Sequence, residues 1–83
     1  MKGVKYNLTM KLPQDEIYEK KEINMKELIK DIEEKFKTRY FLDDIIITNQ
    51  IIYNIVKRPM NCSKLLRNKL TITRVKAEDV IKK

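Results

Sequence analysis

The first segment of the chain alternates apolar and polar residues with a period of two. The apolar set of this alternation is Val4, Tyr6, Leu8, Met10 and Leu12. Successive side chains of a strand point to opposite faces, so the pattern predicts a strand over residues 4–12 with one buried face. Pro13 ends this strand, because proline has no N–H to donate to a neighbouring strand. Such a strand needs partner strands beside it and other elements packed on its apolar face, which the rest of the chain must supply.

Residues 24–39 have the features of an amphipathic helix. Asn24 suits the N-cap, and Glu27 stands three residues later, as in a capping box. The apolar stripe of this helix consists of Met25, Leu28, Ile29, Ile32, Phe36 and Tyr40. Asp31–Lys35 and Glu33–Lys37 are spaced for ion pairs along the exposed side.

Two segments fit more than one kind of element. Residues 14–22 are compatible with a short helix, or with a turn followed by a polar edge strand, and we favour the strand. Residues 45–57 are rich in β-branched residues, which suits a strand. Their apolar spacing and a cap at Thr48 or Asn49 favour a helix that ends at Lys57. Residues 41–47 then form a connector or a short strand.

The last third of the chain predicts a short helix and a second strand. Ser63 can cap a helix from Lys64 to Lys69, and residues 70–75 alternate again. Residues 77–83 are expected to be a frayed helical tail. We therefore predict an α+β fold that forms one domain over residues 1–83. The N-terminal and C-terminal strands share a small antiparallel or mixed sheet packed with two to three helices. A domain of this size buries a modest core, and forming a homodimer is a natural way to bury more.

Composition excludes several kinds of active site. The chain has no histidine, one cysteine (Cys62) and one glycine (Gly3). Histidine-based triads, zinc sites of the His/Cys type and glycine-rich phosphate loops are therefore excluded. On a strand, Asp43 and Asp44 point to opposite faces and make a poor metal site. We expect no enzyme, no metal and no cofactor.

The lone Cys62 indicates a reducing, intracellular compartment. No apolar run is long enough for a membrane span, so we expect no membrane partner. The abundance of Lys, Ile and Asn indicates an AT-rich genome, whether bacterial, plasmid-borne or viral.

Charge is distributed unevenly along the chain, whose net charge is +7. Residues 13–44 hold seven basic residues and ten acidic ones. Residues 45–77, the acid-free segment, hold no acidic residue and seven basic ones. These are Lys57, Arg58, Lys64, Arg67, Lys69, Arg74 and Lys76. Any function that depends on positive charge is expected in this segment.

The acid-free segment also has the outline of a helix-turn-helix unit, with residues 63–69 as its second helix. Leu65 and Leu66 are predicted to face the core. The outer face then carries side chains that can contact phosphates and base edges: Ser63, Lys64, Arg67 and Asn68. The cations expected to flank or extend this contact are Lys57, Arg58, Lys69, Arg74 and Lys76. The resulting hypothesis is a DNA- or RNA-binding protein that uses a basic helix near its C-terminus.

The run Asn7-Leu8-Thr9-Met10-Lys11-Leu12-Pro13 resembles the strand of ribbon-helix-helix repressors, and residues 24–36 resemble the second helix of that family. The resemblance implies a dimer in which Asn7, Thr9 and Lys11 enter the major groove of DNA. It covers less than half of the chain. The span from Pro13 to Asn24 is too short for the first helix and turn of that family.

A different class of function fits the same charge. A protein-interaction module, such as an assembly subunit or a small inhibitor, would use these cations to dock on an acidic protein surface. The segment from Ile45 to Val56 is rich in apolar residues for so small a core. Isoleucines left exposed there would mark a protein interface.

Overall fold

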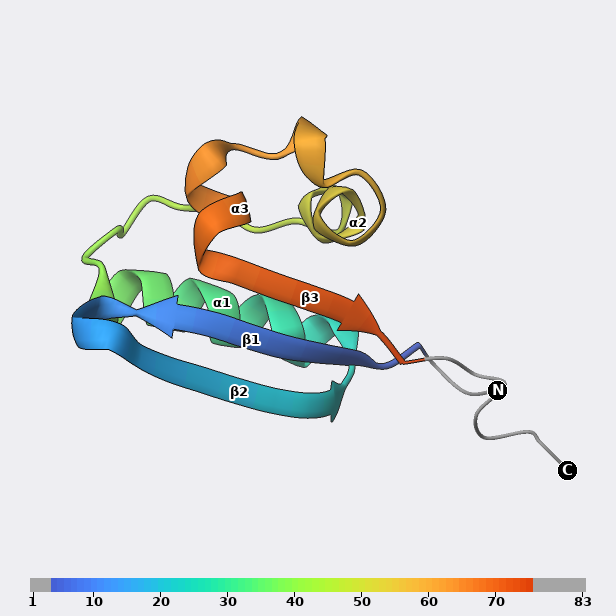
Figure 1. Cartoon of the computed structure of the whole chain (residues 1–83), viewed down its shortest axis with the longest axis horizontal. Coiled ribbons are helices and arrows are strands. Elements are labelled where there is room, and N and C mark those ends of the chain that lie inside the picture. Colours follow the sequence, from blue (N-terminus) through green and yellow to red (C-terminus); the bar gives the residue numbers. More distant parts are fainter. Residues whose placement is uncertain (1–3, 76–83) are drawn as a thin grey trace, which may run out of the picture.

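The computed structural model describes residues 4–75 and shows an α+β fold (Figure 1). The strands and helices in chain order are β1 (Tyr6–Leu12), β2 (Glu16–Ile23), α1 (Met25–Arg39), α2 (Asn49–Lys57), α3 (Lys64–Lys69) and β3 (Leu70–Arg74). Two short 3-10 turns, Pro13–Asp15 and Pro59–Asn61, lie between β1 and β2 and between α2 and α3. The predicted fold class is confirmed. Residues 76–83, including the tail predicted to be helical, lie outside the described residues.

The three strands form one antiparallel sheet in the order β2-β1-β3. Leu8 in β1 lies opposite Lys20 in β2 and Ile72 in β3. The predicted pairing of the first and last strands is therefore confirmed. Residues 16–23 form the polar edge strand that we favoured over a helix.

The central position of β1 contradicts the ribbon-helix-helix interpretation. Both edges of β1 are hydrogen-bonded to strands of the same chain, so it has no free edge for a second copy. A turn and β2 also occupy the place of that family's first helix. Asn7 and Thr9 do lie on the outer face of the sheet, where they stand opposite Thr73 and Thr71.

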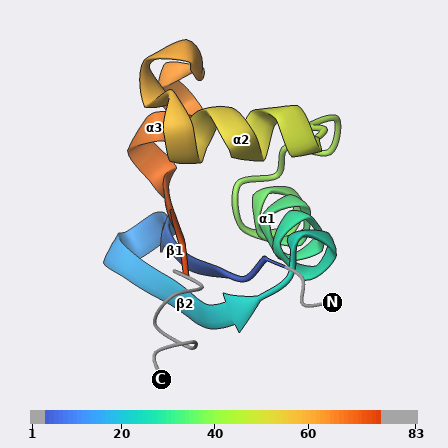
Figure 2. The ribbon, with the colours of Figure 1, turned by 90° about the vertical axis from the view of Figure 1, so that its right-hand side faces the viewer.

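The helices cover the inner face of the sheet (Figure 2). Helix α1 packs on β1, while α2 packs on β3 and on α1. Their apolar sides enclose a core together with the inward residues of the strands. The fully buried side chains are Leu8, Met10, Leu28, Ile32, Phe36 and Ile52. This confirms the inward face of β1 and the apolar stripe of α1.

Two residues expected in the core lie at the surface. Val4 precedes β1 and is 40% exposed, as is Leu65. Helix α3 has six residues, so it turns only one side chain, Leu66, into the core. Leu65 is the next residue along the chain and points about 100° away from Leu66 around the helix.

All three predicted N-caps are formed. The side-chain oxygens of Asn24, Thr48 and Ser63 accept hydrogen bonds from backbone N–H groups at the start of α1, α2 and α3. The Asn24 bond, from the N–H of Glu27, is 2.8 Å long. The prediction that residues 45–57 contain a helix is confirmed from Asn49 onward, and residues 41–47 are a connector without strand structure.

The predicted ion pairs along α1 are wrong. Asp31 pairs instead with Lys20 of β2 (3.2 Å), and the carboxylate of Glu33 accepts a hydrogen bond from the backbone N–H of Ile47 (2.9 Å). Both acids have partners from elsewhere in the fold. Lys20 reaches Asp31 because it lies on the inner face of β2, opposite Leu8.

Candidate nucleic-acid interface

Ion pairs in the described part of the chain are confined to residues 13–44, the stretch with more acids than cations. They join Lys20 to Glu27 and Asp31, and Arg39 to Glu16, and all of these residues belong to β2 and α1. Within residues 4–75, no cation of the acid-free segment forms an ion pair. Their charge is therefore not neutralised by a neighbouring carboxylate in this part of the molecule.

Two cations of the acid-free segment, 17 positions apart in sequence, line the same pocket. Lys57 is the last residue of α2, and Arg74 is the last residue of β3. The antiparallel register places Arg74 opposite Tyr6, at the end of the sheet that faces the viewer in Figure 2. Helix α2 packs across β3 and brings Lys57 to this end. We call the space between them, with a volume of about 360 Å³, the α2 pocket.

The remaining lining of the α2 pocket combines three kinds of side chain. They are two tyrosines (Tyr6 and Tyr53), two amides (Asn49 and Gln50) and two apolar residues (Met25 and Val56). Among the described residues, no acid lines the pocket. Such a lining can attract an anion, offer ring faces for stacking, and both donate and accept hydrogen bonds.

The α2 pocket takes most of its lining from one side of α2. Its five residues from that helix follow the spacing i, i+1, i+4, i+7 and i+8, which places them along one face. The core-facing residues Ile52 and Ile55 lie on another face. Helix α2 thus carries the core on one side and the pocket on the other.

Arg58 lies beside this pocket. It follows Lys57 and places its guanidinium carbon 5.9 Å from the ring centre of Tyr53. Tyr53 is 45% exposed, so both groups are accessible to solvent. Three predicted site residues, Lys57, Arg58 and Arg74, therefore lie at or next to the α2 pocket.

The predicted site residues of α3 form a separate group. Lys64, Arg67 and Asn68 are exposed, as expected for the outer face of that helix. Arg67 contacts the sulfur of Met60 at 3.9 Å, and the hydroxyl oxygen of Ser63 accepts the capping bond at 3.3 Å. Helix, turn and short helix occur in the predicted order, with a connection of residues 58–63.

Lys69 lies apart from both groups. Its ammonium is 5.4 Å from the ring centre of Tyr40, whose hydroxyl donates to the carbonyl of Lys11. Lys69 precedes β3 and Arg74 ends it, which separates them by about 17 Å along the strand. Lys76, the ninth predicted residue, lies outside the described residues.

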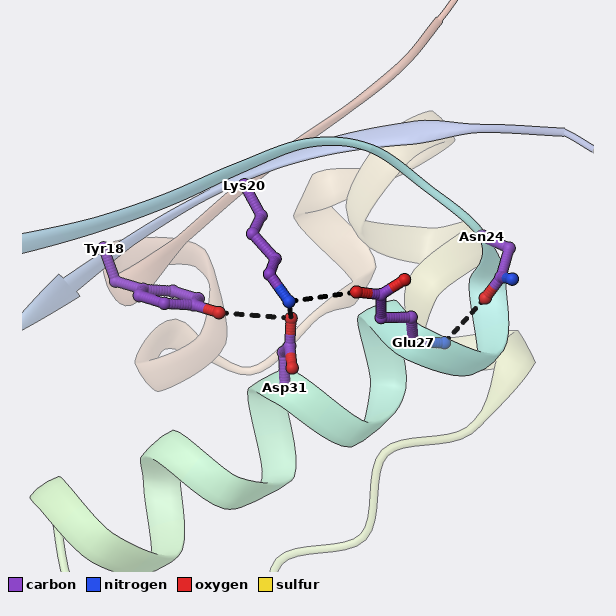
Figure 3. Close-up of polar contacts among 5 residues, drawn as sticks. All are labelled: Tyr18, Lys20, Asn24, Glu27 and Asp31. Atoms are coloured by element: carbon purple, nitrogen blue, oxygen red, sulfur yellow. Dashed lines mark hydrogen bonds and ion pairs between the residues drawn. The ribbon is translucent and has the colours of Figure 1, made fainter.

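A second polar cluster joins β2 to α1 (Figure 3). The ammonium of Lys20 contacts the carboxylates of Glu27 and Asp31 at 2.9 and 3.2 Å, and the Tyr18 hydroxyl donates to Asp31. Hydrogen bonds to these two acids raise the pKa of Lys20. Burial, followed by the charge of Asp31, raises the pKa of Tyr18.

The charged and polar groups of this second cluster all have partners within the cluster. Each carboxylate in it has a cation within hydrogen-bond distance, and the Tyr18 hydroxyl has an acceptor. The described part of the chain contains no buried side-chain nitrogen or oxygen without a partner. We therefore assign the cluster to holding β2 against α1.

Sequence reasoning missed most of the α2 pocket. The alternation over residues 4–12 predicts Tyr6 on the buried face of β1; Tyr6 is half-buried against the core and also lines the pocket. Asn49, Gln50 and Tyr53 carried no functional assignment. The sequence does show that Asn49, Tyr53 and Lys57 are spaced along one face of a helix. It does not indicate that Arg74 of β3 lies across the pocket from that face.

Across residues 4–75, no helix has the length and apolar character needed to cross a membrane. The same residues contain no cluster of three or more side chains suited to a metal ion. Comparison of the chain with protein families, with curated proteins and with solved structures finds no match.

Proposed function

We propose that this protein binds nucleic acid through the exposed cations of the acid-free segment. The observation that carries the proposal is the separation of charge. The acids of residues 13–44 pair with Lys20 and Arg39 and lie among the other cations of β2 and α1, whereas the cations from Lys57 to Arg74 form no ion pair within the described residues and have no acid in their own segment. A polyanion supplies the missing counter-charge, and its binding releases condensed counterions.

The contact is centred on the α2 pocket. Lys57, Arg58 and Arg74 bind phosphates there, and the two arginines offer paired N–H donors that match phosphate oxygens. Lys64 and Arg67 of α3 contact further phosphates along the nucleic acid. Lys69 contributes least, because it lies at the other end of the sheet against Tyr40.

The salt dependence of binding tests this proposal. Affinities for a labelled 15-nucleotide single strand and a 15-base-pair duplex are measured by fluorescence anisotropy between low and moderate salt. Each phosphate contact contributes about −0.7 (single strand) to −0.9 (duplex) to the slope of log K against log salt. The double substitution Lys57→Ala/Arg74→Ala should weaken binding and flatten the slope by about 1.4–1.8.

Lys30→Ala/Lys37→Ala is the matched control. It removes the same charge from exposed positions of α1, where both lysines lie beside Glu33 and Glu34. This variant should keep most of the affinity and the full slope. If the two double variants give equal slopes, the assignment of the contact to the acid-free segment is wrong. The absence of binding by the unmodified protein at low salt would reject nucleic-acid binding altogether.

The second candidate function is docking on an acidic protein surface. Phe41, Ile46 and Met60 are 70–81% exposed, and a protein partner would remove them from water. This candidate was also suggested by the many isoleucines between Ile45 and Val56, but three of them, Ile47, Ile52 and Ile55, are buried in the core. Size-exclusion chromatography with light scattering, run beside the titration, separates the two candidates. A stable homodimer that binds neither oligonucleotide favours the interaction module.

A further inference from the structure

We propose that the α2 pocket seats one unpaired nucleotide, so that the protein prefers single-stranded nucleic acid to duplex. This inference rests on the proposed function and adds the form of nucleic acid and the mode of contact. It comes from the side chains that surround Lys57 and Arg74.

Charge complementarity selects an anionic occupant. Lys57 and Arg74 enter the pocket from α2 and β3, and no acid lines it among residues 4–75. Arg58 adds a third cation next to Tyr53. The phosphates on the two sides of a bound nucleotide can therefore each be contacted by a cation.

Aromatic rings and amides distinguish a nucleotide from a simple anion. Tyr53 is 45% exposed and Tyr6 is half-buried, so ring surface is accessible within the pocket. Every base has a flat face that stacks on such a ring or on an arginine guanidinium. The amides of Asn49 and Gln50 each supply a donor and an acceptor for the edge of the base.

The concave shape of the site favours an unpaired base. Bases within a duplex are stacked and paired, and they enter a pocket only after being turned out of the helix at a cost in free energy. A single strand avoids most of this cost. An acidic peptide would satisfy the cations but would leave the tyrosine rings without a stacking partner.

Substitution of Tyr53 tests the inference with four labelled ligands: oligo(dT) and oligo(rU) of 15 nucleotides, a 15-base-pair duplex, and a 15-residue poly-glutamate. We expect the single strands to bind at least tenfold more tightly than the duplex or the peptide. Tyr53→Ala should weaken single-strand binding roughly 5- to 150-fold, which corresponds to the loss of one stacked base. Tyr53→Phe keeps the ring and should retain the affinity.

Phe41→Ala is the matched control for the loss of an aromatic ring. Phe41 is 81% exposed and follows the C-terminal end of α1, away from the α2 pocket. This variant should bind like the unmodified protein, and circular dichroism should show all three variants folded. A stronger preference for oligo(dT) or for oligo(rU) supports the inference equally.

Three results would overturn the pocket inference while leaving the proposed function in place. They are equal affinity for single strand and duplex, equal effects of Tyr53→Ala and Phe41→Ala, and binding of poly-glutamate as tight as that of oligo(dT). In each case, Lys57→Ala/Arg74→Ala would still flatten the salt slope. If that double substitution also has no effect, the proposed function fails as well.

Discussion

A hydrogen bond from the backbone of Ile47 to the carboxylate of Glu33 connects the segment before α2 to α1. The bond is 2.9 Å long and partly buried. It lies two residues before α2, the helix that supplies most of the α2 pocket. We predict that Glu33→Ala loosens this connector and destabilises the protein.

The size of the effect follows from the kind of bond. Removing a hydrogen bond to a charged acceptor costs about 1.5–3 kcal/mol. The Ile47 side chain is 4% exposed and holds the connector independently, so the loss should remain local instead of releasing α2. For a domain of this size, each kcal/mol lowers Tm by about 4–8 °C. Glu33→Gln keeps a neutral acceptor, whose bond is worth about 0.5–1.5 kcal/mol, so it should cost only the difference, about 1–1.5 kcal/mol.

Urea unfolding and amide hydrogen exchange measure the two consequences separately. Glu34→Ala is the control, because it removes the same charge from the next, exposed position of α1. It should change stability by less than about 0.5 kcal/mol. The Ile47 amide should exchange faster in Glu33→Ala than in Glu34→Ala. Equal stability of these two variants, with unchanged exchange at Ile47, would refute the role given to Glu33.

Two further predictions concern α1 and its contact with β2. Asn24→Ala should lower the free energy of unfolding by about 1 kcal/mol in urea titrations, because the first turn of α1 loses its cap, whereas Asn24→Asp should cost little. The pKa values of Lys20 and Tyr18 are both raised in the folded state. The protonated forms of these two side chains therefore contribute to the free energy of unfolding. This contribution is fully present below the unfolded pKa values, at roughly pH 10, and is lost as the pH rises further. Unfolding titrations from pH 8 to 11 should show stability falling less steeply in Lys20→Gln/Tyr18→Phe than in the exposed-site control Lys21→Gln; parallel curves would contradict this assignment.

The elements of this fold are readable from short stretches of sequence. The alternation of apolar and polar residues over residues 4–12 predicts strand β1. The N-cap at Asn24 and the apolar stripe after it predict helix α1. Thr48 and Ser63 are caps whose side chains bond to N–H groups three residues later, so their effect is local. Each of these predictions needed only information within a single element.

The errors arise where a side chain has partners from two elements. Asp31 and Lys35 have ideal spacing for a helical ion pair, but β2 presents Lys20 to Asp31 from the inner face of the sheet. Lys35 instead lies 4.5 Å from the ring centre of Tyr18. Predicting these contacts requires the register of β2 against β1, which a polar strand specifies only weakly.

The same reason explains why the α2 pocket could not be predicted. The sequence predicts, from charge alone, that Lys57 flanks the basic helix and that Arg74 extends its contact. Their meeting depends on β3 pairing with β1 so that Arg74 stands opposite Tyr6. Sequence composition identified the charged residues, while strand pairing determined which of them share a site.

Stability measurements on the pocket variants can distinguish a structural role for these cations from a binding role. A cation that supports the fold has a partner, as Lys20 has in Glu27 and Asp31, and its removal weakens the protein. Lys57 and Arg74 line one pocket without an acid among the described residues, so in the free protein they repel each other. Their replacement by alanine should leave the free energy of unfolding unchanged or raise it slightly, even as nucleic-acid affinity falls. That opposition between stability and binding is typical of residues kept for a ligand. A clear loss of stability in Lys57→Ala/Arg74→Ala would instead assign both cations to the fold, and the charge separation would then no longer support a binding site.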